Sequence, residues 1–361
     1  WDQNTEYIAI KQPDEGKDIH ISPLFRKSFV YRSGPEKVLL HINSLGYHDA
    51  YINGRPVTSS VLNPAVSQHP KRSLVTTYDV SDLLHEGENE IVIWAGIGWY
   101  LNHYVHVNIS WNSLTADMKD LVFPVPEHEP YVRAQLENTG VGGYEILART
   151  DSTWEAADIG RYYSGRSWVN GEVFDVRKSV KDFSRESLSA ARWQPVLVGD
   201  IPVHRVSPQM CEQNIFYRTY RPVSVHKVAD SSYVYDLGHV FAGFVEIDMP
   251  VVEDGKSVKF FYEDFYLEKP EDFRDMKLFA DEYIGDGRTA GRYSNKFQYK
   301  ALRYLKIQGL AQPLDFSAIT GRAITTGYDG DSEFACSDED MNAIHDMVHK
   351  TMKALTLGGY M

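Results

Sequence analysis

The chain has 361 residues, of which 43% are apolar and 24% charged, and its formal net charge is -13. This composition is typical of a folded globular protein with two or three domains, and not of a disordered chain. The acidic balance argues against a nucleic-acid partner, because binding to phosphates requires a basic surface, and no apolar run reaches the roughly 18 residues of a membrane span.

Short strands and tight turns are predicted from Lys37 to Ser110. The runs KVLLHIN and YHDAYI are extended, and Asn53-Gly54 supplies the positive φ angles of a type I′ hairpin turn. A second turn at Glu86 to Asn89 precedes the buried-strand run EIVIWAGIG, and PYVRAQLEN and YEILART predict further strands. Many short strands separated by turns indicate an antiparallel sandwich or jelly roll.

The segment 178–210 is the predicted boundary between two β-rich units. Its first half is polar with a short helix expected, and its second half carries prolines and little periodicity. Beyond it, VEIDMPV and KSVKFFYE flank Glu253-Asp254-Gly255, which predicts a hairpin, and ALRYLKIQGL predicts a buried strand. Residues 264–295 are charged without a clear period, which favours a solvated loop over a ligand-facing one.

One long amphipathic helix is predicted at the C-terminal end. Ser337 and Asp340 have the form of a capping box, and Gly358-Gly359 would end the helix. An apolar stripe recurs at helical spacing at Met341, Ile344, Val348, Met352 and Leu355. We therefore predict a mainly β fold with two antiparallel β-sandwich or jelly-roll domains, at 1–195 and 196–330, followed by one C-terminal α-helix within 331–361.

Motifs for metals, cofactors and nucleophiles are weak. His103 and His106 have HxxH spacing, but in a strand these positions point to opposite faces. The turns NTGVGGYE (138–145) and GEVFD (171–175) contain oxygen ligands suited to Ca²⁺, although ordinary turn chemistry is the simpler interpretation. We therefore expect no required cofactor and leave a structural calcium ion open. Cys211 and Cys336 lack motif spacing, and we expect them to be small buried side chains.

Paired carboxylates are the catalytic chemistry that is hardest to exclude. A glycosidase needs two, about 5 Å apart if it retains configuration and about 6.5–9.5 Å apart if it inverts it. The candidates are Glu172, Asp175, Asp236, Glu263 and Asp264. In a chain with 50 acidic residues, a capping or solvated role is the simpler interpretation for each.

Several segments, in order, resemble a known family. INSLGYHDAYINGRPV (42–57), the run from LNPAV to GIGWY (62–100) and GEVFDVR (171–177) resemble the N-terminal β-sandwich of bacterial α-L-rhamnosidases. VYDLGHVFAGFVEI (234–247), FFYEDF (260–265) and residues 281–309 are similar to the concanavalin-like domain of that family. Departures from the family pattern occur in the first domain at Ser81, Phe174 and Val176. In the second domain they occur at Leu237, His239, Val240 and Lys300-Ala301-Leu302.

The resemblance implies that the terminal helix is the first helix of a catalytic α/α barrel. The family's acids follow that helix, beyond Met361, so the resemblance transfers no catalytic residue to this segment. The parent would be an inverting glycoside hydrolase that removes terminal α-L-rhamnose from glycans or glycosides, with one carboxyl as general acid and another activating water. Alone, the segment is expected to be inactive, with a rhamnose-containing carbohydrate and its own barrel as partners.

Three alternatives stay open from the sequence. A stand-alone, lectin-like carbohydrate-binding module would use Trp99, Tyr100 and Asn102 as one patch and Glu172 with Asp175 as another, unless Trp99 is core and the acids cap strand ends. A structural linker would expose the apolar stripe of the terminal helix. An independent active site would need a cleft where two of the second-domain acids (Asp236, Glu263 and Asp264) face each other. A homodimer is left open, and an extracytoplasmic location is favoured over a cytoplasmic one.

Overall fold

The computed structural model of the chain describes most of its length. The described residues are 1–12, 19–32, 34, 37–67, 71–98, 130–140, 143–164, 171–199, 201, 205–276, 280–327 and 333–358. They form two compact units, the first comprising Trp1–Ser59 with Ser67–Gln209 and the second Ser60–Val66 with Met210–Met361. The domain limits expected from the sequence, 1–195, 196–330 and 331–361, remain predictions.

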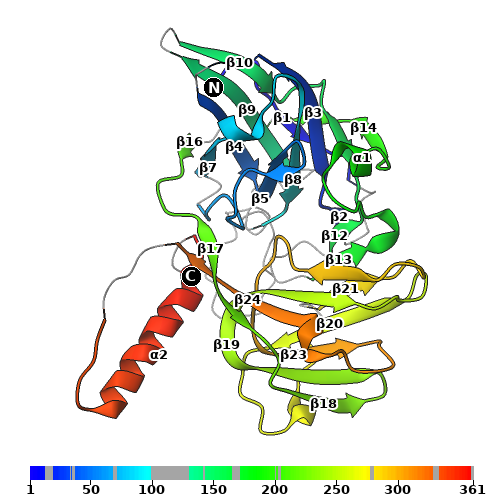
Figure 1. Cartoon of the computed structure of the whole chain (residues 1–361), viewed down its shortest axis with the longest axis vertical. Helices are drawn as coiled ribbons and strands as arrows, with labels where there is room; N and C mark the ends of the chain where they lie inside the picture. Colours follow the sequence, from blue (N-terminus) through cyan, green and yellow to red (C-terminus); the bar gives the residue numbers. More distant parts are fainter. Residues whose placement is uncertain are drawn as a thin grey trace, which may run out of the picture. The chain divides into compact units, whose positions relative to one another are not determined.

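The first unit is built around two sheets (Figure 1). One has the order β15-β1-β9-β4-β7-β16, with β10 beside β9. Its strands are β1 (Tyr7–Ala9), β4 (Lys37–Leu45), β7 (Arg72–Asp79), β9 (Tyr131–Gly140), β10 (Gly143–Arg149), β15 (Leu197–Gly199) and β16 (Arg205–Pro208). The pairing of β16 with β7 is parallel, so the sheet is not purely antiparallel as predicted.

The second sheet of this unit has the order β14-β11-β3-β8-β5-β6. Its strands are β3 (Leu24–Tyr31), β5 (Tyr47–Ile52), β6 (Arg55–Pro56), β8 (Gly87–Gly96), β11 (Glu155–Ala157) and β14 (Trp193–Pro195). A smaller group places β12 (Arg161–Ser164) between β2 (Ile19–Ile21) and β13 (Glu172–Asp175). The short helices are η1 (Ser81–Leu83), η4 (Val176–Lys178) and α1 (Arg185–Leu188).

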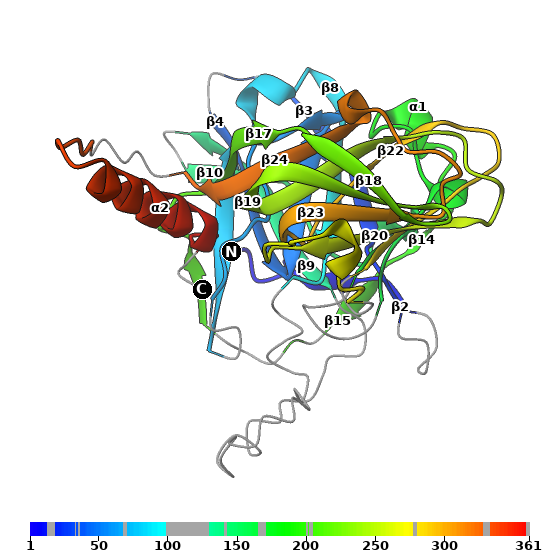
Figure 2. The same cartoon turned by 90° about the horizontal axis from the view of Figure 1, so that it is seen from below.

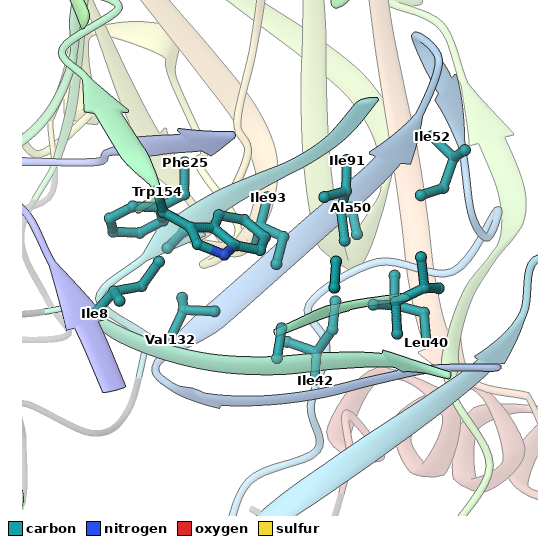
Figure 3. Close-up of a cluster of buried hydrophobic side chains, with 14 of the residues drawn as sticks. Ile8, Phe25, Leu40, Ile42, Ala50, Ile52, Ile91, Ile93, Val132 and Trp154 are labelled. Carbon is teal, nitrogen blue, oxygen red and sulfur yellow. The ribbon is translucent and has the colours of Figure 1, made fainter. Parts of the chain in front are cut away.

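Alternating apolar residues of the two sheets form the core of the first unit (Figure 3). On β4, Leu40 and Ile42 are fully buried, and on β8, Ile93 is fully buried and Ile91 nearly so. This follows from the two-residue period of a strand, which turns every second side chain to one face. Trp154 lies in the same core (Figure 3). Full burial of one isoleucine or leucine side chain contributes about 1.5–3 kcal/mol to the stability of the fold.

The second unit is organised around one long strand, β19 (Ser232–Met249). Within this unit the order is β17-β24-β19-β23-β20-β21, and β18 and β22 also pair with β19. Figure 2 shows β24, β19, β23 and β20 running beside one another. The remaining elements are β17 (Asn214–Tyr220), β18 (Ser224–Ala229), β20 (Ser257–Glu263), β21 (Asp281–Ile284), β22 (Gly291–Ser294), β23 (Lys300–Gln308), β24 (Ile319–Thr326), η5 (Pro270–Asp272) and η7 (Phe316–Ala318).

A bend in β19 lets this strand serve two layers. Its register with β23 shifts between Asp236 and Phe241, and Gly238 in the bend has a φ of 78°. Before the bend β19 pairs with β18, and after it with β22 and β24. Such bulges re-aim a strand from one sheet to another. The rings of Phe260 on β20 and Tyr293 on β22 pack with centroids 4.6 Å apart, which joins the two layers in one core.

The long helix α2 (Glu339–Leu355) follows the last strand and is drawn in red in Figure 1. Its N-cap is Asp338, not the predicted Ser337, because the Asp338 side chain accepts from the amides of Asp340 and Met341 at 3.0 and 3.2 Å. At the other end, the Thr326 amide of β24 donates to the Thr356 carbonyl at 2.8 Å. The helix is therefore fastened to the sheet through its C-terminal end.

The structure confirms the mainly β fold with a long C-terminal helix and corrects one further local prediction. Asn53 and Gly54 have φ angles of 51° and 77°, as a type I′ turn requires. The predicted hairpin around Glu253-Asp254-Gly255 is wrong, because β23 lies between β19 and β20 and pairs with both. The predicted boundary segment 178–210 contains α1 and supplies β14, β15 and β16 to the sheets of the first unit.

Candidate functional site

Glu172, the first residue of β13, is fully buried and forms an internal ion pair. Arg161 Nη1 on the neighbouring strand β12 donates to Glu172 Oε2 at 3.0 Å. The Arg161 side chain is itself buried, and its guanidinium carbon lies 4.4 Å from the centroid of the Phe174 ring. A carboxylate in this setting balances a buried cation and presents no surface to a sugar.

Asp175, at the end of the same strand, caps the short helix η4. Its Oδ1 accepts from the amide of Arg177 at 3.1 Å and from Arg177 Nε at 2.8 Å, while Oδ2 accepts from Arg177 Nη2 at 2.8 Å. Burial opposes ionisation, but the hydrogen bonds and charge of Arg177 outweigh it and lower the pKa of Asp175. This is the strand-end cap that was the simpler interpretation of the residue.

The other predicted carbohydrate-binding patch, Trp99 with Tyr100 and Asn102, lies outside the described residues. His103 and His106 also lie outside them. Within the described residues, no group of three or more His, Cys, Asp or Glu side chains is placed to hold a metal ion. A structural calcium ion at one of the oxygen-rich turns, which the sequence left open beside ordinary turn chemistry, stays a hypothesis.

Asp236 lies at the bend of β19 and is held by an arginine. Arg303 of β23 donates from Nε to Asp236 Oδ1 at 2.9 Å and from Nη2 to Oδ2 at 2.8 Å, and the Gly238 amide donates to Oδ1 at 2.7 Å. Partial burial would raise the pKa of Asp236, but these donors lower it on balance. A carboxyl group kept ionised in this way is unsuited to the role of a general acid, which requires a raised pKa.

Glu263, the last residue of β20, is held in a similar way. Arg274 donates from Nε to Glu263 Oε2 at 2.9 Å and from Nη2 to Oε1 at 3.0 Å. Glu263 and Asp236 both stand opposite Tyr304 of the intervening strand β23. Their Cα atoms are therefore two strand spacings apart, roughly 9.5 Å, but each carboxylate is engaged by its own arginine.

Asp264 lies in a different place, an open groove of about 890 Å³. The groove is lined by β17, by the bend of β19 and by α2, which contribute Tyr217, His239 and Asp346 among other residues. Partial burial and the adjacent Glu263 carboxylate raise the pKa of Asp264, a pattern that general acids share. Asp236 lines a separate pocket. Neither this groove nor that pocket is lined by two of the three second-domain acids.

The residues that sequence reasoning missed are the arginine partners of these acids. Arg177 follows Asp175 by two positions, so that pair carried a local signal. Arg161, Arg274 and Arg303 come from other strands or loops, and nothing in the local pattern identifies them. The cysteine prediction was wrong, since Cys211 and Cys336 are both exposed. No helix among the described residues has the length and apolarity needed to cross a membrane.

Comparison with known proteins gives a consistent result. The family model for the alpha-L-rhamnosidase N-terminal domain matches residues 33–217, and that for the bacterial alpha-L-rhamnosidase concanavalin-like domain matches residues 226–325. A curated alpha-L-rhamnosidase of Formosa agariphila is 24% identical over 331 residues, which cover 90% of this chain but 34% of the relative.

Solved structures of the same description share the fold. The alpha-L-rhamnosidase from Dictyoglumus thermophilum superposes with a TM-score of 0.79 at 23% identity, over 99% of this chain and 39% of its own. That of Streptomyces avermitilis, complexed with L-rhamnose, gives a TM-score of 0.76 at 21% identity, over 94% of this chain and 32% of its own. The chain thus spans about a third of the length of the relatives it matches.

Proposed function

The chain belongs to the bacterial alpha-L-rhamnosidase family, and from this premise we propose that it is the non-catalytic front portion of an inverting glycoside hydrolase. The parent enzyme would remove terminal α-L-rhamnose from glycans or glycosides. Its two catalytic carboxyls, one protonating the leaving oxygen and one activating water, would lie in the remainder of the protein. The β-rich segment would support that catalytic part.

The state of the second-domain acids is the observation that carries the non-catalytic assignment. Asp236 and Glu263 are each neutralised by a two-point arginine pair. Asp264, whose raised pKa would suit a general acid, lacks a second carboxylate from this set in its groove. An inverting mechanism needs two carboxyls across one sugar ring, so the environments of the three candidate acids support a structural role for them.

The exposed face of α2 supports the proposal that this helix packs against further protein. None of its residues is buried. The predicted stripe is exposed by 37–52%, at Met341, Ile344, Val348, Met352 and Leu355. Solvated apolar side chains in a row of this kind are typical of an interface. We propose that the catalytic α/α barrel of the parent covers this stripe, with α2 as the first helix of the barrel.

Hydrolysis of p-nitrophenyl α-L-rhamnoside tests both parts of the proposal. The parent protein should release p-nitrophenol, and the 361-residue chain should give no rate above the buffer blank. Activity of the isolated chain would refute the non-catalytic assignment, and an inactive parent would refute the proposed substrate.

Two further measurements sharpen the test. Proton NMR of the first product should show the β-anomer of L-rhamnose before mutarotation if the parent inverts configuration, whereas the α-anomer would refute inversion. In the parent, Asp264→Asn should leave the hydrolysis rate within about twofold, because Asp264 is not a catalytic acid under this proposal. Substitution of an essential acid would instead lower the rate by several orders of magnitude. A loss of that size at Asp264 would place the chemistry in this segment.

A further inference from the structure

A second, smaller pocket of the second unit has features of a sugar-binding site. It has a volume of about 190 Å³ and lies between β18, β19 and β23 and the loop that follows β20. Clefts for drug-sized ligands measure about 300–1,000 Å³, so this pocket is suited to a single ring. We propose that it binds one neutral sugar residue, with the ring of Tyr266 as a stacking surface and the Arg303–Asp236 pair as a hydrogen-bonding edge.

Polar groups converge on the pocket from three strands. Ser224 and His226 alternate on β18 and stand opposite Asp236 and Val234 of β19, so all four belong to one face of the sheet. In the described part of the chain, neither the Ser224 hydroxyl nor the His226 ring has a hydrogen-bond partner, although both line the pocket. Unused donors and acceptors in a concave site are what fixes the orientation of a polar ligand.

The aromatic surface comes from the loop after β20. Tyr266 is 74% exposed although it lines the pocket, and its ring centroid lies 5.8 Å from the guanidinium carbon of Arg303. An amphipathic ring of this kind packs against an apolar surface and can still hydrogen-bond through its hydroxyl. A sugar ring offers the matching surfaces, with C–H groups on its face and hydroxyls at its edge.

The loop that carries Tyr266 is held in place by ion pairs. Arg274 is bonded to Glu263 at 2.9 Å, and Lys306 of β23 is bonded to Asp275 at 2.7 Å. These pairs fasten residues 274 and 275 to the strands, while residue 264 continues directly from β20. Both ends of the loop are therefore restrained, and restraint of this kind lowers the entropy that a loop loses on binding.

The charged side chains that line the pocket favour a neutral sugar over an anionic one. The Arg303 cation is already matched by Asp236, and Glu268, which also lines the pocket, has no ion-pair partner among the described residues. An anionic ligand such as a uronate would meet a net negative wall, so a neutral sugar is favoured. This site goes beyond the proposed function, because binding here would require no catalytic acid.

Saturation-transfer NMR with the 361-residue chain tests the proposal. The probes are two neutral sugars, methyl α-L-rhamnoside and methyl β-D-galactoside, and the anionic D-glucuronate. At least one neutral glycoside should bind saturably with a Kd of millimolar order, and D-glucuronate should bind at least about fivefold more weakly. Absence of saturable binding by both neutral sugars, or equal binding of D-glucuronate, would overturn it.

Substitutions locate the site. Tyr266→Ala should weaken binding at least about fivefold through loss of the stacking surface. The matched control is Tyr144→Ala on β10 of the first unit, where the side chain is 60% exposed and the Kd should not change. Binding that survives Tyr266→Ala, or that is lost equally in both variants, contradicts the assignment. The parent protein with Tyr266→Ala should still hydrolyse the substrate, because sugar binding at this pocket is separate from catalysis. An inactive wild-type parent would therefore refute the proposed function and leave the pocket proposal to the binding measurements.

Discussion

The buried histidine of the first unit makes the stability of that unit depend on pH. His48 of β5 is fully buried. Its Nδ1 lies 2.7 Å from Ser44 Oγ, and its Nε2 lies 3.0 Å from Tyr78 Oη and 3.2 Å from Thr76 Oγ1. Burial lowers the pKa of His48 from 6.5 to about 3, because the imidazolium would lose its hydration.

The direction in which pH changes the stability follows from the number of protons that the native and unfolded states bind. Between pH 3 and 6.5 the unfolded chain binds a proton at His48 and the native chain does not, so acid favours unfolding. The contribution of His48 to stability is complete above pH 6.5 and declines as the pH falls through this window. At pH 5 the loss is about 2 kcal/mol, from roughly 1.4 kcal/mol for each pH unit below 6.5.

Urea unfolding followed by tryptophan fluorescence reports on the first unit, because the segments of the second unit, 60–66 and 210–361, contain no tryptophan. The free energy of unfolding should fall between pH 7.5 and pH 5 by about 2 kcal/mol more in the wild type than in His48→Gln. The control is His85→Gln, at an exposed position, which should keep the wild-type pH dependence. Equal losses in the wild type and His48→Gln, or an NMR titration of His48 near pH 6.5, would refute the reasoning.

Two substitution pairs test other parts of the structure. Lys300→Met should reduce the free energy of unfolding by about 3–5 kcal/mol, because it leaves the buried Asp281 carboxylate without the ammonium group 2.9 Å away. Lys256→Met, at an exposed ion pair, should cost at most about 1 kcal/mol, and a similar loss in both variants under urea would contradict this account. Asp338→Ala should destabilise α2 by about 1 kcal/mol and reduce the helical circular-dichroism signal. Ser337→Ala should leave that signal unchanged, and the reverse order would restore Ser337 as the cap.

Local sequence patterns predicted those parts of the fold that local physics determines. The alternation of β4 and β8 identified buried strands because each strand turns every second side chain to one face. Asn53-Gly54 identified a turn because both residues tolerate positive φ angles. The stripe of α2 identified an amphipathic helix, since residues three and four apart share one helical face.

The candidate acids show where such reasoning stops. Five carboxylates could be named from the sequence, but four of them are engaged by arginines, and three of those arginines are at positions that the local pattern does not indicate. Arg303, which holds Asp236, comes from a strand 67 residues away along the chain. The pocket beside Tyr266 was missed for the same reason, because its polar groups come from separate strands and a loop.

The sequence by itself thus determined the type of most elements, the existence of two β-rich units and the family resemblance, which the comparisons confirm. Tertiary structure alone decided which strands are neighbours, as when β23 takes the place beside β20 that a local hairpin would have given to β19. It also decided the charge environment of each acid. The physical reason is that backbone conformation and side-chain alternation are set over a few residues, whereas strand pairing and ion pairing join residues that are distant along the chain.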